Sequence, residues 1–313
     1  RPAPHKQVCS APAADPAPRS PNKMTTDIKE NNETTDFSNC KAIIGFLDIL
    51  GYDTLVKKMI NDSGFVKRFN TLMYGLTVDL LNKLKCLNLL TLTNEPVYEE
   101  YFKKVTETIK IRCIFDSVIF SLPLSAITFN SREFDNKTTI MNCIETFFSL
   151  IAMFSTLFIS KMGHIFRGGI SIGSHYETER DNYLFIFSEA HNKAVHLERE
   201  AKYPRILLED NLKLYLNEIS CTHMDKFFYK DDDGHYCFDM YSILQIMDNS
   251  QNVLTDINKG LLLNMESNTR NKKELAKLIY FAKYHNRKVC SGSLNFPALS
   301  MDIDKFEKII ENG

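Results

Sequence analysis

A single carboxylate lies near the end of the apolar run "AIIGFLDILGY", which covers residues 42–52. This charged residue is Asp48. A buried strand disfavours an unpaired charge, because a carboxylate that leaves water loses a large solvation free energy. We therefore expect a cation or another partner to meet Asp48 in the folded protein.

A second acid has similar surroundings. Asp116 lies in "CIFDSVIF", where two β-rich runs meet at Asp116-Ser117 and predict a hairpin. If this hairpin packs beside the strand of Asp48, both carboxylates, with the flanking Phe46 and Phe115, reach one end of a sheet. Paired oxygen ligands of this kind suit magnesium or manganese, with substrate phosphates completing the coordination shell.

Each aspartate alone also has a simpler interpretation. Asp48 can cap the helix that follows its strand, and Asp116 can be an ordinary turn residue. The presence of the pair, with its flanking aromatic residues, favours the metal.

The segments that position these acids alternate between strand and helix patterns. Strands are predicted over residues 41–49, 106–124 (two runs), 164–176, 182–188 and 204–210, with a further hairpin over 227–241. Helices are predicted over residues 52–90, 138–162 and 189–203, and from about residue 254 onward. This order predicts an α/β (α+β) fold in which helices flank a mixed sheet.

Composition narrows the class of protein. The chain has 313 residues, of which 44% are hydrophobic and 25% charged, and a net charge of -1, so we expect no nucleic-acid partner. No apolar run approaches the ~20 residues of a membrane helix, and the longest, residues 147–160, is expected to be a buried core helix. We therefore expect no membrane partner. The 8 cysteines form no C-x-x-C pair, which favours reduced thiols in a cytoplasmic protein.

The N-terminal segment differs from the rest of the chain. Residues 1–40 are rich in Pro and Ala and then in polar residues, so we expect them to be disordered. Met24 is the expected natural start, which would make residues 1–23 non-native. A catalytic domain is expected over residues 41–245, with a C-terminal helical extension over 246–313 packed on it.

Five short segments resemble the class III nucleotidyl cyclases, and within that class the bacterial Pycsar pyrimidine cyclases. They are "FLDILGY" (46–52), "FDSV" (115–118), "RGGISIG" (167–173), "SEAHNKAVHLE" (188–198) and "AKLIYFAKYHN" (276–286). Each segment is short, but their order and spacing together are specific. The resemblance implies a ferredoxin-like mixed sheet with flanking helices.

The resemblance also implies a reaction. In these cyclases the 3′-hydroxyl of a nucleoside triphosphate attacks its own α-phosphate and releases pyrophosphate, with two divalent metal ions (manganese or magnesium) held by two aspartates. Carried over to this chain, the metal ligands are Asp48 and Asp116, with the backbone carbonyl of Ile49 as a third. Metal ions are the strongest counter-charges available for the developing phosphoryl charge.

The class uses an Asn and an Arg, four residues apart on one helix, to place the ribose and stabilise the transition state. The resemblance puts Asn192 at the asparagine position and His196 at the arginine position, which departs from the pattern. Losing a cationic donor there can cost about 3 kcal/mol. Arg199, at i+7 on the same helical stripe, could replace it or could belong to a solvated charge run, and a protonated His196 is another possibility.

Two positions bear on the choice of base. Where purine cyclases of the class hold the base with a Lys and an acid, this chain has Arg112 and Phe185. A Phe removes the partner of a purine amine and leaves room for a smaller base, while Arg112 can donate to a pyrimidine carbonyl. Uracil offers two carbonyl acceptors, so UTP is slightly favoured over CTP. Alternatively, Phe185 is simply a core residue.

The segment "RGGISIG" has two interpretations. Its glycines can let the strand approach the substrate or a partner subunit closely. Arg167 can bind phosphate, or it can serve the structure of the site.

The resemblance finally implies partners. The aspartates of one subunit and the Asn helix of another would form composite sites in a two-fold homodimer. The product, cyclic UMP or cyclic CMP, would be an antiviral-defence second messenger that activates a separate effector protein. A catalytically silent nucleotide-binding homologue and a purine nucleotide cyclase are the alternatives.

Overall fold

The computed structural model describes residues 41–77, 79–80, 107–127, 136–180, 183–219, 222–290 and 294–311. These residues belong to one compact unit, Asp36–Gly313. The predictions for residues 1–40 and for the helical stretch over 81–90 lie outside the described residues. The predicted boundary between residues 245 and 246 stays a prediction.

The described strands form one mixed sheet in the order β2-β3-β1-β4-β6-β8-β7, with β5 paired to β4. β4 and β6 are parallel, and the other pairs are antiparallel. The strands are β1 (Lys41–Ile49), β2 (Lys110–Ile114), β3 (Ser117–Pro123), β4 (Phe166–Arg180), β5 (Tyr183–Ser188), β6 (Ile206–Leu208), β7 (Phe228–Lys230) and β8 (Tyr236–Phe238).

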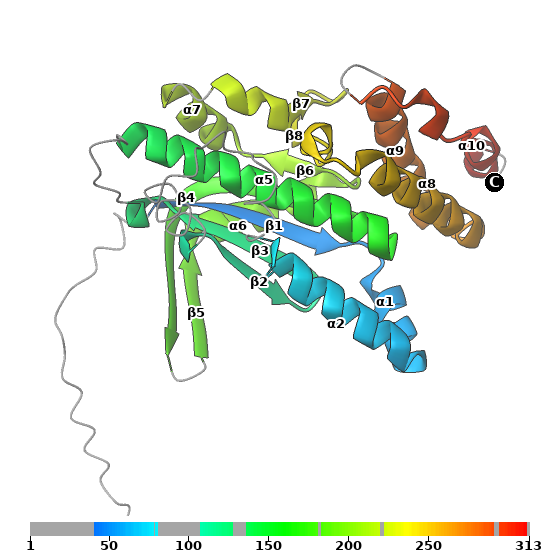
Figure 1. Cartoon of the computed structure of the whole chain (residues 1–313), viewed down its shortest axis with the longest axis horizontal. Helices are drawn as coiled ribbons and strands as arrows, with labels where there is room; N and C mark the ends of the chain where they lie inside the picture. Colours follow the sequence, from blue (N-terminus) through cyan, green and yellow to red (C-terminus); the bar gives the residue numbers. More distant parts are fainter. Residues whose placement is uncertain are drawn as a thin grey trace, which may run out of the picture. The chain divides into compact units, whose positions relative to one another are not determined.

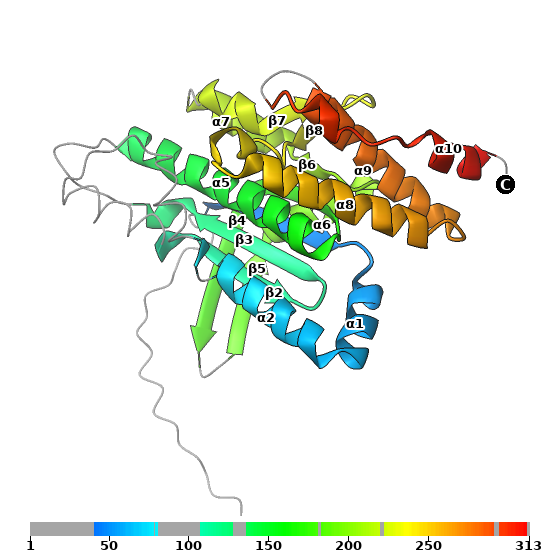
Figure 2. The same cartoon turned by 45° about the vertical axis from the view of Figure 1, so that its right-hand side comes forward.

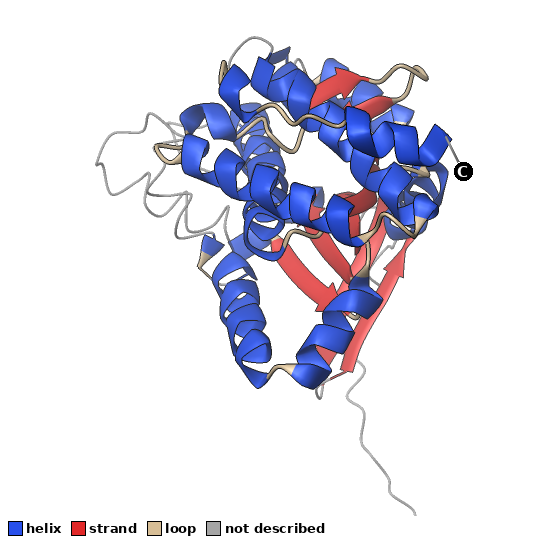
Figure 3. Ribbon diagram, turned by 90° about the vertical axis from the view of Figure 1, so that its right-hand side faces the viewer, coloured by secondary structure: helices blue, strands red, loops and turns tan. Residues whose placement is uncertain are grey.

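The helices lie between and after these strands. They are α1 (Tyr52–Asn61), α2 (Ser63–Thr77), α5 (Asn136–Met162), α6 (Glu189–Ala201), α7 (Asp210–Glu218), α8 (Ser250–Ser267), α9 (Lys272–Cys290) and α10 (Asp304–Glu311). Short 3-10 helices occupy Leu124–Ala126, Thr222–Phe227, Leu244–Ile246 and Pro297–Leu299. Figure 3 shows the strands in red beside the helices in blue.

The first half of the fold has ferredoxin-like topology. β1, the α1–α2 pair, β2, β3, α5 and β4 follow one another along the chain, and their strands lie side by side in the order β2-β3-β1-β4. This is the split βαβ arrangement, in which a helix precedes β2 and another precedes β4. The predicted mixed sheet with flanking helices is confirmed.

Helix α5 covers one face of the sheet (Figures 1 and 2). Ile43 and Leu47 of β1 belong to the main hydrophobic core together with apolar residues of α5 such as Phe147 and Ile151. Helix α5 is long and apolar enough to cross a membrane, but 89% of its most apolar window is buried inside the fold. The predicted core helix is therefore confirmed.

Helix α6 packs against the other face through small residues. Ala190 and Ala194 of α6 form a second cluster with Ala42 and Ile44 of β1. Gly169 of β4 lies so close to the helix that an added Cβ would be 2.4 Å from the backbone oxygen of Ala194. The absence of a side chain at residue 169 thus permits the close approach of α6 to β4.

The β2–β3 hairpin differs from the prediction by one residue. The turn consists of Phe115 and Asp116, and Ser117 already begins β3. Phe115 has a φ of 54°, a left-handed conformation that glycine adopts far more readily. Because sequence patterns favour Gly or Asn at such a position, Phe115 gave no signal of the turn.

Two other features were not predicted as they occur. Helix α7 begins at Asp210, two residues after β6 ends, whereas the sequence predicted a strand over 204–210 and no helix after it. The β4–β5 hairpin is longer than expected on its β4 side and projects from the sheet (Figure 1).

Gly169→Ala is expected to destabilise the fold by about 1–3 kcal/mol, because the new methyl group would overlap backbone of α6. Urea denaturation of the purified protein measures this free energy of unfolding. Gly64→Ala in α2 is the matched control, since its methyl group would meet only the side chains of Asp62 and Arg68. Equal stability of the two variants would contradict the close approach of α6.

Candidate functional site

The two predicted metal ligands lie at one end of the sheet. Asp48 of β1 is paired across the strands with Ser117 of β3, the residue directly after Asp116. The backbone N–H of Ile49 donates to the carbonyl of Asp116 at 2.8 Å. Strand pairing therefore brings together two acids that are separated by 68 residues in the sequence.

Burial, and after it repulsion by neighbouring acids, disfavours the ionised form of Asp48. Burial of its carboxyl group, together with the negative charges of Glu198 and Asp116, raises the pKa of Asp48 to about 6, against the opposing effect of Arg167. The ionised form is thus less favourable in the folded protein than in an unfolded chain. A bound cation would relieve this repulsion.

Arg167 of β4 is the neighbouring positive charge. It is paired across the strands with Asp48, and its Nη2 lies 3.4 Å from Asp48 Oδ2. The same Nη2 forms an ion pair with Oε1 of Glu198 on α6. Of the two interpretations of Arg167, these contacts support a place in the structure of the site, whereas a phosphate contact stays a prediction.

Glu198 was not predicted as a site residue. It lies on the buried face of α6 with Ala190, Ala194 and Ala201. This spacing of small residues defines the face that packs on the sheet, and it places a carboxylate on that face. The signal was therefore present, but the surrounding charged run "EREAK" concealed it.

The donor set of this site fits a hard divalent cation. Asp48 and Asp116 supply carboxylate oxygens, the ligand type that magnesium and manganese prefer. In the described ranges, no group of three or more His, Cys, Asp or Glu side chains has the arrangement of a metal site. The remaining ligands would therefore come from substrate phosphates and water, and the role of the Ile49 carbonyl stays a prediction.

The predicted ribose and transition-state residues lie on the outer surface of α6. Asn192, His196 and Arg199 are all exposed, and His196 Nε2 lies 3.2 Å from Glu200 Oε1. Among the described residues, no hydrogen bond or ion pair joins these three side chains to Asp48 or Asp116. Their catalytic roles stay predictions.

The two predicted base-selecting residues lie near the β4–β5 hairpin. Arg112 of β2 donates from Nε and Nη2 to Glu177 Oε1 of β4, at 3.1 and 2.9 Å. Phe185 of β5 is 47% exposed and pairs with Thr178, the residue after Glu177. Phe185 is therefore not a core residue, which was the alternative interpretation.

Glu177 is a further residue that the sequence prediction missed. Burial raises the pKa of its carboxyl group, but hydrogen bonds from His175 and Arg112 and the charge of Lys110 lower it to about 2. Glu177 is thus ionised at all pH values at which the protein would be used. Its fixed negative charge orients Arg112.

The two predicted aromatic residues have different surroundings. Phe46 is half-buried against α6 and meets the ring of His191 edge-to-face, with centroids 5.6 Å apart. Phe115 is 88% exposed at the hairpin turn beside Asp116. A substrate-binding role stays a prediction for both, but only Phe115 presents its ring to the solvent.

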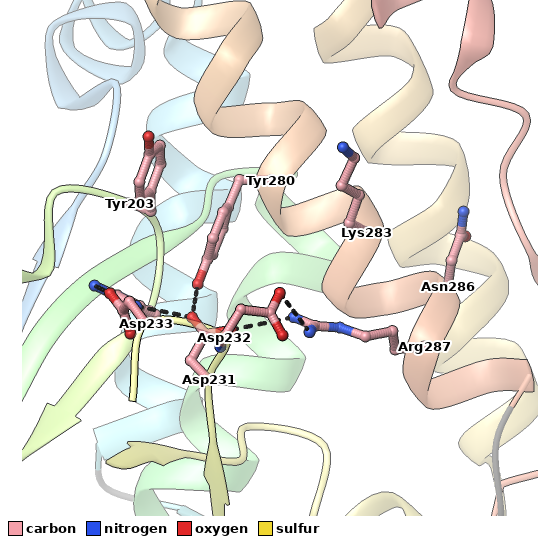
Figure 4. Close-up of a pocket in the computed structure, with 9 residues that line it drawn as sticks. Tyr203, Asp231, Asp232, Asp233, Tyr280, Lys283, Asn286 and Arg287 are labelled. Carbon is pink, nitrogen blue, oxygen red and sulfur yellow. Dashed lines mark hydrogen bonds and ion pairs between the residues drawn. The ribbon is translucent and has the colours of Figure 1, made fainter. Parts of the chain in front are cut away.

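A separate cavity of about 620 Å³ lies between α9, the β7–β8 turn and the segment after α6. Figure 4 shows Asp231 at its base, bonded to Tyr280 and facing Arg287. Arg205 Nη1 donates to Asp231 Oδ2 at 2.8 Å, so the buried charges neutralise one another. The cavity contains none of the predicted site residues.

Comparisons with known proteins give only distant likenesses. No protein-family model matches the chain, and no curated protein matches it. Among solved structures, the chain is similar to the adenylyl cyclase CyaB from P. aeruginosa, with 13% identity, a TM-score of 0.34, and coverage of 64% of this chain and 94% of that chain.

Two guanylyl cyclase domains give similar values. The monomeric guanylyl cyclase domain of the RhoGC fusion protein from Blastocladiella emersonii has 15% identity and a TM-score of 0.33, covering 64% of this chain and 94% of that chain. The guanylate cyclase domain of RhGC from Catenaria anguillulae, in complex with GTP, has 14% identity and a TM-score of 0.30, covering 64% and 97%. Similarity at this level assigns neither a family nor an activity to the chain.

Asp48→Asn is expected to stabilise the protein in a metal-free buffer at pH 8, by about 1–3 kcal/mol. The pKa of Asp48 rises from 3.8 to about 6 on folding, so ionised Asp48 opposes folding. Its contribution is most favourable below pH 4 and is lost as the pH rises through 6. Urea denaturation with EDTA at pH 4.5 and 8 should show the advantage of the variant growing with pH.

Asp62→Asn is the control for this measurement, because its effect has the opposite sign. A hydrogen bond from the Phe65 backbone lowers the pKa of Asp62 below its ordinary value of 3.8, so the stabilisation by ionised Asp62 is already complete above about pH 4. This variant should therefore be less stable than wild type by nearly the same amount at pH 4.5 and at pH 8. An Asp48→Asn effect that does not change with pH would contradict the repulsion at Asp48.

Proposed function

We propose that this chain is a nucleotidyl cyclase, which converts a nucleoside triphosphate to a 3′,5′-cyclic monophosphate and pyrophosphate. The observation that carries the proposal is the pairing of β1 with β3, because it joins Asp48 and Asp116 at a site with excess negative charge. The five segments that resemble class III cyclases support the same reaction. In the ferredoxin-like half of the fold, the first two of them form this acidic end of the sheet.

The proposed reaction is an intramolecular displacement at phosphorus. The ribose 3′-oxygen forms a bond to the α-phosphorus, and the bond from that phosphorus to the oxygen bridging to the β-phosphate breaks. The hydroxyl proton passes to solvent, and pyrophosphate leaves with the electron pair of the broken bond. Divalent cations, when bound, favour the ionised hydroxyl and offset the charge of the triphosphate.

The side chains of this chain would hold and orient the substrate. Asp48 and Asp116 are the proposed ligands of two manganese or magnesium ions. Asn192 would hold the ribose, and Arg199 or a protonated His196 would donate to the transferring phosphate. A positive donor is needed there because negative charge develops on the phosphoryl oxygens.

A homodimer with composite sites is part of this proposal. Asn192, His196 and Arg199 lie on the exposed face of α6, whereas its opposite face packs on the sheet. Side chains on that exposed face are available to a second copy of the chain. This arrangement supports a two-fold dimer in which α6 of one subunit completes the acidic site of the other.

We also propose a pyrimidine substrate, UTP or CTP. Arg112 is held by Glu177, and Phe185 lies on the strand that pairs with the Glu177 segment. An oriented guanidinium suits the carbonyl acceptors of a pyrimidine, and an aromatic ring replaces the acid that a purine amine would need. The resemblance to Pycsar cyclases supports a role of the product as an antiviral-defence messenger with a separate effector.

Asp48→Asn and Asp116→Asn are each expected to lower cyclase activity at least a hundredfold, on the order seen when a catalytic charge is removed. Purified protein with manganese and a triphosphate, followed by mass spectrometry of the cyclic product, provides the measurement. Asp62→Asn serves as the control, since Asp62 is an exposed acid at the α1–α2 junction. Variants as active as wild type would overturn the proposed site.

A panel of the four nucleoside triphosphates tests the choice of base. Cyclic UMP is the expected main product, with cyclic CMP second, because Arg112 faces more acceptors on uracil. Cyclic AMP or cyclic GMP as the main product would establish the purine alternative. Binding of triphosphates without any cyclic product would identify a silent homologue instead.

A further inference from the structure

Arg167 lies between two carboxylates that belong to different elements. Its Nη2 contacts Asp48 on β1, at 3.4 Å, and also Glu198 on α6. Charge-assisted hydrogen bonds between nitrogen and oxygen are usually about 2.7–2.9 Å long. The hydrogen bond from the guanidinium to Asp48 is therefore a long one, and the guanidinium is shared between Asp48 and the ion pair with Glu198.

Glu198 is held in place by the packing of α6. Its side chain is 8% exposed and lies on the helix face that also carries Ala194 and Ala201. Gly169, two residues after Arg167, brings the helix backbone against β4. The packing of α6 on the sheet thus places the Glu198 carboxylate beside Arg167.

We propose that Glu198 is a positioning residue that holds Arg167 back from Asp48 and so keeps Asp48 available to a divalent cation. The inference rests on the proposed metal-dependent function of Asp48 and Asp116. It adds a residue that acts through Arg167 and does not itself touch the substrate.

The physical reason is competition between two cations for one carboxylate. Asp48 can be neutralised by the guanidinium or by a metal ion, and it gains from either. A carboxylate at residue 198 lowers the free energy of the state in which Arg167 is displaced from Asp48, because the displaced guanidinium keeps a buried partner. Without that partner, metal binding would leave the charge of the partly buried Arg167 uncompensated.

Manganese binding without nucleotide tests the proposal directly. We expect Glu198→Gln to weaken the affinity for Mn²⁺ about tenfold, as measured by electron paramagnetic resonance of free Mn²⁺. Arg167→Ala should tighten it, since the competing cation is gone. In the double variant, Glu198→Gln should change the affinity by no more than about twofold relative to Arg167→Ala alone.

A purely electrostatic effect of Glu198 on the metal gives a different result. Removing one negative charge would then weaken binding by the same factor with or without Arg167, and this additive outcome would overturn the proposal. Asp231→Asn is the matched control, because Asp231 is also a buried acid paired with an arginine, Arg205, but in the separate cavity of Figure 4. It should leave the affinity for Mn²⁺ unchanged.

Two further measurements keep the outcomes distinguishable. Asp48→Asn should abolish specific Mn²⁺ binding, and a wild-type protein whose Mn²⁺ binding does not depend on Asp48 contradicts the proposed function itself. Circular dichroism melting shows whether Glu198→Gln folds. If Glu198→Gln does not fold, the comparison of Arg167→Ala with wild type still tests the proposal. Unchanged or weaker Mn²⁺ binding after removal of Arg167 would show that Arg167 does not compete with the metal for Asp48, and this would overturn the proposal.

Discussion

Negative charge gathers where β1, the β2–β3 turn and α6 meet, and one guanidinium offsets only part of it. The charges of Asp116 and Glu198 both act on Asp48, while Arg167 contacts Asp48 and Glu198. Replacing these charged side chains by apolar ones would be expected to stabilise the fold. The cluster of carboxylates is the physical constraint from which the proposed binding of cations and triphosphate follows.

Helix α6 has two faces with different chemistry. One face consists of alanines and Glu198 and lies against glycines of β4, so the position of the helix relative to the acidic site is fixed by backbone contact. The other face carries Asn192, His196 and Arg199 into the solvent. A rigid helix of this kind can present polar groups to a second molecule with little loss of conformational entropy.

The sequence was sufficient to predict the strand that carries Asp48 and the hairpin that carries Asp116, because both have apolar strand patterns. The meeting of the two acids depended on the hairpin packing beside β1, and the pairing of β1 with β3 provides this. It was less informative where a residue contradicts its local preference. Phe115 occupies a left-handed turn position, and Glu198 faces the interior from a charged segment. Glu177 was missed because its partner Arg112 lies on another strand, so only the fold brings them together.

Helix α9 is bound to the β7–β8 hairpin by polar contacts of buried acids as well as by apolar packing. Asp231, in the turn of this hairpin, accepts a hydrogen bond from Tyr280. Asp239, directly after β8, accepts one from Tyr284 and forms an ion pair with Lys288. A chain truncated before α9 would leave these carboxylates in the protein interior without those donors. The sheet and the C-terminal helices are therefore expected to unfold in one cooperative transition.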